Sequence, residues 1–476
     1  MIFNSFQFLW LFPMIFVGYY AFNFLMQKQM HGRWSNYLLL ILSYALYIQY
    51  VPWCALVLLW VTVATYLTAL IISKQGRQKK TICWGGVILA VLPLVFFKYY
   101  NFLSDNINAL LGHHFLTGLN WAVPIGISFF SFQAIGYMVD VYKQRVPVEK
   151  NFWDYALFVS FFPQIMSGPI SKASELLPQI KKIRPFDYTK AVQGLKLLLW
   201  GMFLKTVLAD RLGLYVDTVY GSYQYQSGFS CLVASFVYSI QIYGDFAGYS
   251  LMAVGVGKLM GFDLINNFNR PYFASSITEF WKRWHISLTR WLTTYIYIGL
   301  GGNRCSKLRQ YFNIVVTFLV SGIWHGANWN FILWGIMHGL LQCVEKMLGI
   351  DPKGKWNHSH LLKSLMPIRI IMTFVIVDFA WILFRLPSLY IVKCVFHKIL
   401  TWEGTGIFLP SKSTLGFMIL AFMIIFVKEF FEEYLPNVKF FENRHRVVRW
   451  SSYIVVLVMI LLCGVFDSSQ FIYVKF

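Results

Sequence analysis

Two neighbouring stretches decide the fold and chemistry of this sequence: FWKRWHISLTRW (Phe280–Trp291) and SGIWHGANWNFILWGIMHG (Ser321–Gly339). The second places His325 in an otherwise apolar run, between Trp324 and Gly326. A charged side chain at membrane depth costs roughly 2.5–3.5 kcal/mol on insertion scales, so an ionisable residue there is a candidate functional site. A neutral imidazole costs less, and it is the form that a general base requires. The alternative is a structural histidine that hydrogen-bonds between helices, and these stretches alone favour neither.

The composition is that of a membrane protein. Of the 476 residues, 58% are hydrophobic and 13% are charged, and the mean hydropathy is +0.56. Soluble proteins carry about 25% charged residues, so this chain has too few polar side chains to cover a globule in water. We therefore predict an all-α polytopic membrane protein in which residues 1–476 form a single membrane-embedded domain.

Twelve apolar runs are candidate membrane spans, because about 20 apolar residues cross a bilayer. They are approximately Ser5–Leu25, Asn36–Val51, Trp53–Ser73, Ile82–Tyr100, Trp121–Val141, Ala191–Ala209, Phe229–Gly257, Tyr311–His325, Trp329–Lys346, Pro367–Leu386, Thr414–Phe431 and Ser451–Phe471.

The charge pattern predicts the orientation. The chain has 41 Lys and Arg against 20 Asp and Glu, a net charge of +21, and the basic residues lie in short loops between apolar runs. In a soluble protein such a charge would suggest nucleic-acid binding. In a membrane protein it is better explained by the tendency of Lys and Arg to remain in cytoplasmic loops. Attraction of these residues to anionic lipids is a secondary effect. Basic residues follow the first, third and fifth runs, and Lys439–Arg449 precedes the last. Both termini are therefore expected on the non-cytoplasmic side.

Neither a metal site nor a cleaved signal peptide is expected. The seven cysteines are scattered and include no CxxC, and the ten histidines do not cluster at metal-ligand spacing. The first basic residue is Lys28, after the first apolar run, whereas a signal peptide begins with a positive segment. We expect that first run to remain as a membrane helix.

Two segments interrupt the pattern of spans. YALFVSFFPQIMSGPI (Tyr155–Ile170) is apolar but contains prolines and lies between basic loops, which predicts a re-entrant segment surrounded by protein; the alternative is a proline-kinked surface helix. Ile277–Leu292 is predicted as an amphipathic helix at the interface, with Lys282, Arg283 and Arg290 on its wetter side. A solvated basic helix that only anchors the bundle would explain those cations, but it leaves His285 unexplained.

The residues around His325 favour acyl transfer without a covalent intermediate. No GxSxG, HExxH or Walker motif is present. A buried histidine without a neighbouring nucleophile can remove the proton from a hydroxyl as it attacks a thioester directly, which contributes about 10²–10⁴-fold. Burial keeps the imidazole neutral, and the surrounding indoles exclude water.

Other polar residues within the spans have open roles. Asp245 lies in mid-span near Gly244 and Gly248, and Asp140 and Asp378 lie in or at the ends of spans. Each could orient a histidine, bind a polar substrate or carry protons, and a structural hydrogen bond is equally compatible. A break predicted at GANWN (Gly326–Asn330) separates His325 from His338, which we interpret as structural.

Six long motifs occur in an order that resembles the membrane-bound O-acyltransferase family, in particular its bacterial branch of alginate O-acetylation and teichoic-acid D-alanylation proteins. They are PIGISFFSFQAIGYMVDVYK (Pro124–Lys143), FFPQIMSGPI (Phe161–Ile170), QIYGDFAGYSLMAVGVGKLMGF (Gln241–Phe262), NFNRPYFASSITEFWKRWHISLTRWL (Asn267–Leu292), YIYIGLGGNR (Tyr295–Arg304) and WHGANWNFILWGIMHG (Trp324–Gly339). The ending SSQFIYVKF (Ser468–Phe476) also fits. The chain departs from the branch at Thr293–Thr294, where a charged pair is usual, and at Gly299, where proline is usual.

The resemblance implies a fold and a site. It implies a bundle of about 11–13 transmembrane helices with re-entrant and interfacial helices around a central tunnel, with its core at residues 124–339 and peripheral helices at 1–100 and 367–471. It implies that His325 is catalytic and that His285 is a second polar position on the cytoplasmic side of the tunnel. Candidates for lining the tunnel are Trp324, Asp245, Gln241, Trp284 and Asn328.

The resemblance also implies a reaction. The expected activity is O-acylation, most simply O-acetylation, of an exopolysaccharide or cell-wall polymer, in a multi-pass protein of a bacterial inner membrane. No tightly bound cofactor is expected. The donor would be acetyl-coenzyme A or an acyl-carrier-protein thioester, and the partner a periplasmic or membrane-anchored acyltransferase. Two alternatives remain: a transporter or flippase for a lipid-linked glycan, disfavoured by the absence of an inverted repeat, and a scaffold that recruits the partner.

Overall fold

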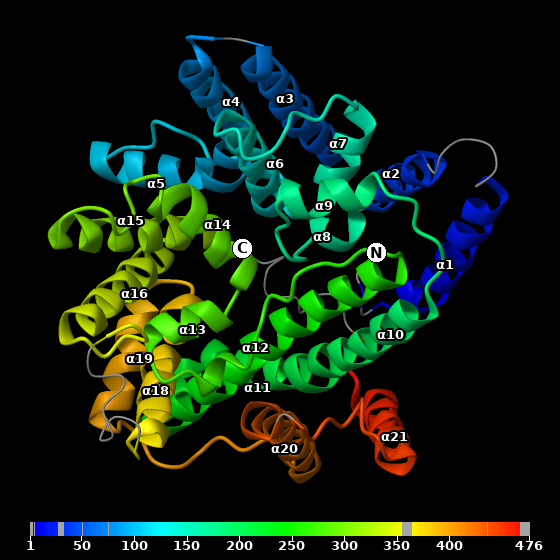
Figure 1. Cartoon of the computed structure of the whole chain (residues 1–476). Coiled ribbons are helices and arrows are strands. Elements are labelled where there is room, and N and C mark those ends of the chain that lie inside the picture. The colour runs from blue at the N-terminus through cyan, green and yellow to red at the C-terminus, as the bar shows by residue number, and fades with distance from the viewer. Residues whose placement is uncertain are drawn as a thin grey trace. The chain divides into compact units, whose positions relative to one another are not determined.

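The described residues of the computed structural model contain helices and no strand, which confirms the all-α prediction (Figure 1). These residues are 3, 5–26, 33–49, 51–74, 76–354, 364–435 and 437–466; the ending SSQFIYVKF lies outside them. Contacts divide the chain into two compact units, unit 1 (Met1–Leu197 and Ala253–Ile265) and unit 2 (Leu198–Met252 and Asn266–Phe476). The assignment of residues 1–476 to one domain stays a prediction.

Each of the twelve predicted spans overlaps a helix of the described residues; Trp121–Val141 is helical only from Ile127, and Ser451–Phe471 extends beyond the described residues. In chain order the helices are α1 (Phe6–Met26), α2 (Arg33–Ile48), α3 (Cys54–Lys74), α4 (Lys79–Leu94), η1 (Val95–Tyr99), α5 (Tyr100–Leu111), α6 (Ile127–Tyr142), α7 (Phe152–Ser160), α8 (Phe162–Ile165), α9 (Ala173–Ile180), α10 (Tyr188–Met202), η2 (Phe203–Ala209), α11 (Asp210–Gly221), η3 (Tyr223–Tyr225), α12 (Gly228–Leu259), η4 (Pro271–Phe273), α13 (Ile277–Arg283), α14 (Ile286–Leu292), η5 (Thr293–Tyr297), α15 (Lys307–His325), α16 (Trp329–Leu348), α18 (Met366–Arg385), α19 (Leu389–Thr401), α20 (Lys412–Tyr434) and α21 (Arg446–Cys463).

Eight helical stretches of the described residues are long and apolar enough to cross a membrane, and α2 forms a shorter apolar helix. Many of their apolar side chains are exposed, such as Phe24 in α1 (79%) and Leu462 in α21 (73%). Apolar exposure on this scale requires a nonaqueous neighbour. The structure therefore agrees with a multi-pass membrane protein, and the number of 11–13 spans stays a prediction.

Unit 1 encloses the broken segment at Tyr155–Ile170. The chain forms two short helices there, α7 and α8, with a bend at Phe161, and every residue from 154 to 171 is buried. This burial is incompatible with the proline-kinked surface helix. It agrees with the expectation that non-helical backbone at this depth is surrounded by protein.

A buried arginine joins the helices of unit 1. The Arg184 guanidinium donates to the backbone oxygens of Gln179 and Ile180 and to the Tyr19 hydroxyl, and it lies 4.4 Å from the Phe262 ring centroid. Because five donors are satisfied by fixed acceptors, one side chain connects α1 with the end of α9 and the segment after α12.

In unit 2 the hairpin of α15 and α16 is closely packed, and the two helices run side by side in Figure 1. A Cβ atom at Gly322 would stand 2.2 Å from the Phe331 carbonyl oxygen, and one at Gly335 would stand 2.3 Å from that of Phe318. Small residues at helix contacts are typical of membrane proteins, where close packing replaces the hydrophobic effect.

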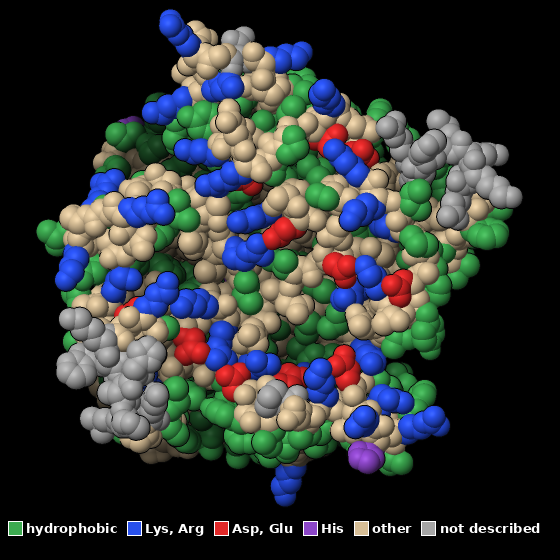
Figure 2. All heavy atoms as spheres, in the orientation of Figure 1, with side chains coloured by type: hydrophobic (Ala, Val, Ile, Leu, Met, Phe, Trp, Pro, Cys, Tyr) green, Lys and Arg blue, Asp and Glu red, His purple; other side chains and the backbone are tan. Residues whose placement is uncertain are grey.

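Lys and Arg outnumber Asp and Glu in this chain, 41 to 20. Figure 2 shows one face on which basic side chains are spread among hydrophobic and uncharged ones, with acidic side chains beside some of them. Among the paired groups in unit 2, Glu433 of α20 accepts from Arg270 (2.7 Å) and Arg283 (2.9 Å), which attaches α20 to α13 and to the loop before it.

A charged triad is buried in unit 2. The Lys205 ammonium, on the π-helical turn η2, lies 2.5 Å from the Asp210 carboxylate and 2.6 Å from that of Asp245 on α12. All three side chains are almost fully buried. Of the roles left open for Asp245, this contact supports the structural one, here as an ion pair between η2 and α12.

We predict that Lys205→Met destabilises the protein by about 3–5 kcal/mol, because it leaves two buried carboxylates without their cation. Removing the charges together, in Lys205→Met/Asp210→Asn/Asp245→Asn, should cost less. Thermal unfolding in detergent measures both. Lys428→Met, which breaks a partly exposed pair with Glu432, is the matched control and should cost less than about 1 kcal/mol. A Lys205 variant no less stable than this control would contradict a compensated triad.

Candidate active site

His285 lies at a break between α13 and α14, so the prediction of one continuous amphipathic helix over Ile277–Leu292 was wrong. Its backbone is left-handed, with φ of 43°, which is uncommon outside glycine. Asn267 holds the break: its backbone oxygen accepts from the Ile286 N–H (2.9 Å) and its Oδ1 accepts from the Ser287 N–H (2.9 Å). These contacts satisfy donors that a helix start leaves open.

The His285 ring is fully buried among aromatic side chains. Its centroid lies 4.6 Å from that of Phe246 and 5.8 Å from that of Trp324, and its Nδ1 atom is 3.4 Å from the Asn267 Oδ1. The residue is outside the eight candidate spans. Burial lowers the pKa of His285 to about 3, so the ring is a neutral imidazole at neutral pH.

His325 is the last residue of α15, where the predicted break at GANWN is confirmed. Gly326 continues in an extended conformation, and Asn328 then caps α16 by accepting from the Asn330 N–H. The buried His325 ring packs edge-on against the rings of Trp324 (5.0 Å), Trp334 (5.1 Å) and Phe384 (5.1 Å). Three elements, α15, α16 and α18, therefore form its surroundings.

Trp324 contacts both histidines. Its ring centroid is 5.0 Å from that of His325 and 5.8 Å from that of His285, and the indole is itself buried. The structure thus brings three predicted site residues together in unit 2. Indoles beside an imidazole exclude water, which is the environment that hydroxyl activation against a thioester requires.

His338 lies in the same aromatic cluster but is held differently. The Trp281 Nε1–H donates to its Nδ1 atom (3.3 Å), and the Trp334 ring lies 4.8 Å away, between His338 and His325. This contact between α13 and α16 supports the structural interpretation of His338.

The remaining candidates are more dispersed. Trp284 is buried against Phe280 and Trp381, with ring centroids 5.5 and 5.0 Å away, one residue before His285. Gln241 is buried on α12, and no described residue hydrogen-bonds its Oε1 atom. Asn328 lies at the turn after His325 and donates to the Pro387 carbonyl (2.8 Å).

The other acids found by sequence have local partners. Asp378 on α18 accepts from the hydroxyls of Ser235 (2.7 Å) and Ser239 (2.6 Å) on α12, and Asp140 pairs with Arg145 (3.2 Å). Within the described ranges there is no group of three or more His, Cys, Asp or Glu placed to hold a metal ion.

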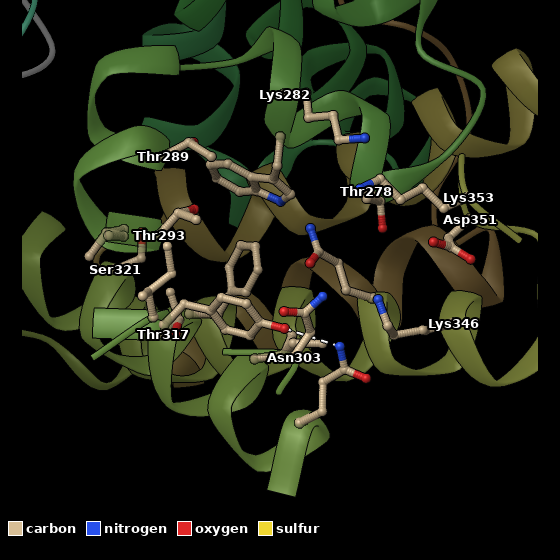
Figure 3. Close-up of a pocket in the computed structure, with 18 of the residues that line it drawn as sticks. Thr278, Lys282, Thr289, Thr293, Asn303, Thr317, Ser321, Lys346, Asp351 and Lys353 are labelled. Atoms are coloured by element: carbon tan, nitrogen blue, oxygen red, sulfur yellow. Dashed lines mark hydrogen bonds between the residues drawn. The ribbon is translucent and has the colours of Figure 1, made fainter. Parts of the chain in front are cut away.

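A cavity of about 430 Å³ opens beside this cluster (Figure 3). Its wall includes Trp281, and neither histidine nor Trp324 lines it. In Figure 3 three lysines lie toward one side, and Thr289, Thr293, Thr317 and Ser321 lie toward the other.

Comparison with known proteins identifies the family of this chain. Residues 141–349 match the model of "MBOAT, membrane-bound O-acyltransferase family". The chain is 35% identical to the "Probable alginate O-acetylase AlgI" of Pseudomonas aeruginosa, over 89% of this chain and 81% of the relative. The chain belongs to the membrane-bound O-acyltransferase family. It is also 34% identical to the "Peptidoglycan O-acetyltransferase" of Helicobacter pylori, over 88% of this chain and 83% of the relative. Its identity to the "Teichoic acid D-alanyltransferase" of Bacillus subtilis is 26%, over 65% of this chain and 79% of the relative. It is therefore an O-acyltransferase.

Several residues that form the site were not predicted from sequence. Phe246, Trp334 and Phe384 supply rings against the histidines, but apolar residues in apolar runs give no signal of such a role. Lys205 belongs to the buried triad and not to this aromatic cluster. Its sequence did carry a signal of burial and pairing, because a lysine within the apolar run at Ala191–Ala209 is costly unless it is paired.

We predict that His285 makes stability depend on pH. Its folded-state pKa lies below the value of 6.5 of an exposed histidine, so the unfolded chain binds the proton more tightly. The contribution of His285 is therefore present above about pH 6.5 and is lost as the pH falls towards 3. Between pH 7 and pH 5 this amounts to about 2 kcal/mol.

Thermal unfolding of wild type and His285→Gln at both pH values measures this effect. The wild type should lose more stability on acidification than the glutamine variant. His397→Gln, which alters an exposed histidine on α19, is the control and should keep the wild-type pH dependence. Equal losses in wild type and His285→Gln would contradict the neutral buried ring.

Proposed function

We propose that this protein transfers an acyl group, most simply acetyl, from a cytoplasmic thioester to a hydroxyl on the non-cytoplasmic side, with His325 as the general base. The observation that carries the proposal is the position of Trp324 in contact with both buried histidines. One indole links His285, at the break between α13 and α14, with His325, the last residue of α15.

In the proposed reaction, each bond that forms is matched by a bond that breaks, and the proton returns from His325 to the leaving group. The His325 imidazole accepts the proton of the acceptor hydroxyl as its oxygen attacks the thioester carbonyl. The carbon–sulfur bond breaks, and the imidazolium returns the proton to the leaving thiolate. Proton transfer of this kind contributes about 10²–10⁴-fold, and the rings around His325 keep the donor from hydrolysis.

The final acceptor in this proposal is an exopolysaccharide or cell-wall polymer outside the cytoplasm of a bacterium. The names of the relatives support this substrate class, since they refer to alginate, peptidoglycan and teichoic acid. Acetyl-coenzyme A or an acyl-carrier-protein thioester would supply the acyl group, and a periplasmic or membrane-anchored acyltransferase would complete the transfer. The basic loops support an inner-membrane orientation with both termini on the non-cytoplasmic side.

We predict that His325→Ala reduces transfer from a labelled acyl thioester by about 10²–10⁴-fold, because the acceptor loses its base. The assay uses the full-length protein purified with its partner. His338→Ala is the matched control, since it removes a buried histidine of the same aromatic cluster. It should lower thermal stability while leaving the rate per folded molecule within a few fold.

The outcomes separate the alternatives. Unchanged transfer by His325→Ala would rule out its catalytic role. No transfer by wild type together with its partner would favour the glycan transporter or flippase. Transfer by the partner alone, in the absence of this protein, would favour the scaffold.

A further inference from the structure

The cavity in Figure 3 has two chemically different sides, and all of its lining residues belong to unit 2. The lining includes the apolar residues Trp281, Leu288, Leu292, Ile314 and Phe318, and Thr289, Thr293, Thr317 and Ser321 lie opposite the lysines. Its volume of about 430 Å³ lies within the range of small-molecule sites, roughly 300–1,000 Å³. The space is thus suited to a flexible apolar chain rather than to a sugar.

Three lysines stand at the other side. Lys282 is in the last turn of α13, Lys346 is in the last turn of α16, and Lys353 is in the loop that follows. Asp351 is the one carboxylate among the lining residues. The cavity therefore carries a net positive charge at the ends of its helices.

These lysines lack the carboxylate partners that some other cations of the protein have. Within the described part of the chain, none of the three forms an ion pair or a hydrogen bond, whereas Lys258 and Lys428 pair with carboxylates. Three uncompensated ammonium groups beside an apolar space are complementary to an anion attached to an apolar chain. Basic pockets between membrane helices on the cytoplasmic side bind the headgroups of anionic lipids in this way.

We propose that this cavity binds an anionic phospholipid of the cytoplasmic leaflet, with the phosphate on Lys282, Lys346 and Lys353 and an acyl chain against Trp281 and Phe318. The leaflet follows from the proposed orientation, in which the loops after α14 and α16 are cytoplasmic. The binding itself requires no acyl transfer.

The lining residues argue against the reacting thioester as occupant. Neither His285 nor His325 lines the cavity, and the Trp281 indole forms its wall with His338 on the other side. A ligand seated there contacts the aromatic cluster through Trp281 without meeting either proposed reactive histidine. The departure at Thr293–Thr294 also falls here, since Thr293 lines the cavity.

The test uses the full-length protein in nanodiscs of phosphatidylcholine, with and without phosphatidylglycerol whose acyl chains carry bromine. Brominated chains quench tryptophan fluorescence on contact. Wild type should show quenching by phosphatidylglycerol beyond that by brominated phosphatidylcholine, and Trp281→Phe should lose that excess. An equal excess in Trp281→Phe would overturn the placement of the chain in this cavity.

Charge removal tests the headgroup site. Lys282→Gln/Lys346→Gln/Lys353→Gln should weaken phosphatidylglycerol binding roughly fivefold for each lysine, from about 1 kcal/mol per cation near a membrane surface. Wild-type affinity in this variant would overturn the proposal. Thr293→Trp, which fills the cavity and keeps its charges, should also reduce binding.

A matched control separates the site from general surface charge. Lys74→Gln/Lys79→Gln/Lys80→Gln removes the same charge from another basic loop, in unit 1, and should leave the excess quenching unchanged. An equal loss in this control would show diffuse attraction and overturn the site. Displacement of the lipid by soluble coenzyme A would instead assign the cavity to the donor. His325→Ala should bind the lipid as wild type does, so loss of acyl transfer and loss of this site are distinguishable.

Discussion

The backbone contact between α15 and α16 is the constraint on which the candidate site depends. Gly322 and Gly335 let each helix approach the carbonyl oxygens of the other, where any side chain would collide. Lipid surrounds such helices with an environment as apolar as their own side chains, so dispersion contacts at close range have to hold them. Because the approach is so close, Trp334 on α16 meets the ring of His325 at the end of α15. A wider separation would remove one wall of the pocket around that imidazole without altering either helix.

The protein buries polar groups in two physically different ways. In the triad, Lys205 stands between Asp210 and Asp245, and opposite charges at about 2.5 Å offset the cost of leaving water. His285 and His325 are instead packed against rings, and burial favours the neutral form of His285.

The sequence predicted the helices and the break after His325, because each is encoded locally. Apolar runs of membrane length identify helices, and the GANWN segment carries the capping residue Asn328 that the structure uses. The break at His285 could not be predicted in the same way. Its left-handed backbone depends on Asn267, eighteen residues earlier, whereas the local pattern of Ile277–Leu292 suits a continuous amphipathic helix. Partners distant in sequence also explain why the rings of Phe246 and Phe384 were missed.

The left-handed conformation of His285 carries a cost that its surroundings have to offset. A left-handed residue other than glycine costs roughly 1–2 kcal/mol, and glycine would adopt the same backbone without this cost. Such strain persists only where the surroundings determine it. Here Asn267 fixes the start of α14, and Glu433 fixes Arg283 at the end of α13. The two helices are thus held at both sides of the break, and the imidazole is directed towards Trp324 instead of following a helix face. The orientation of His285 is therefore a property of unit 2 as a whole, set by contacts from α20 and from the loop after α12.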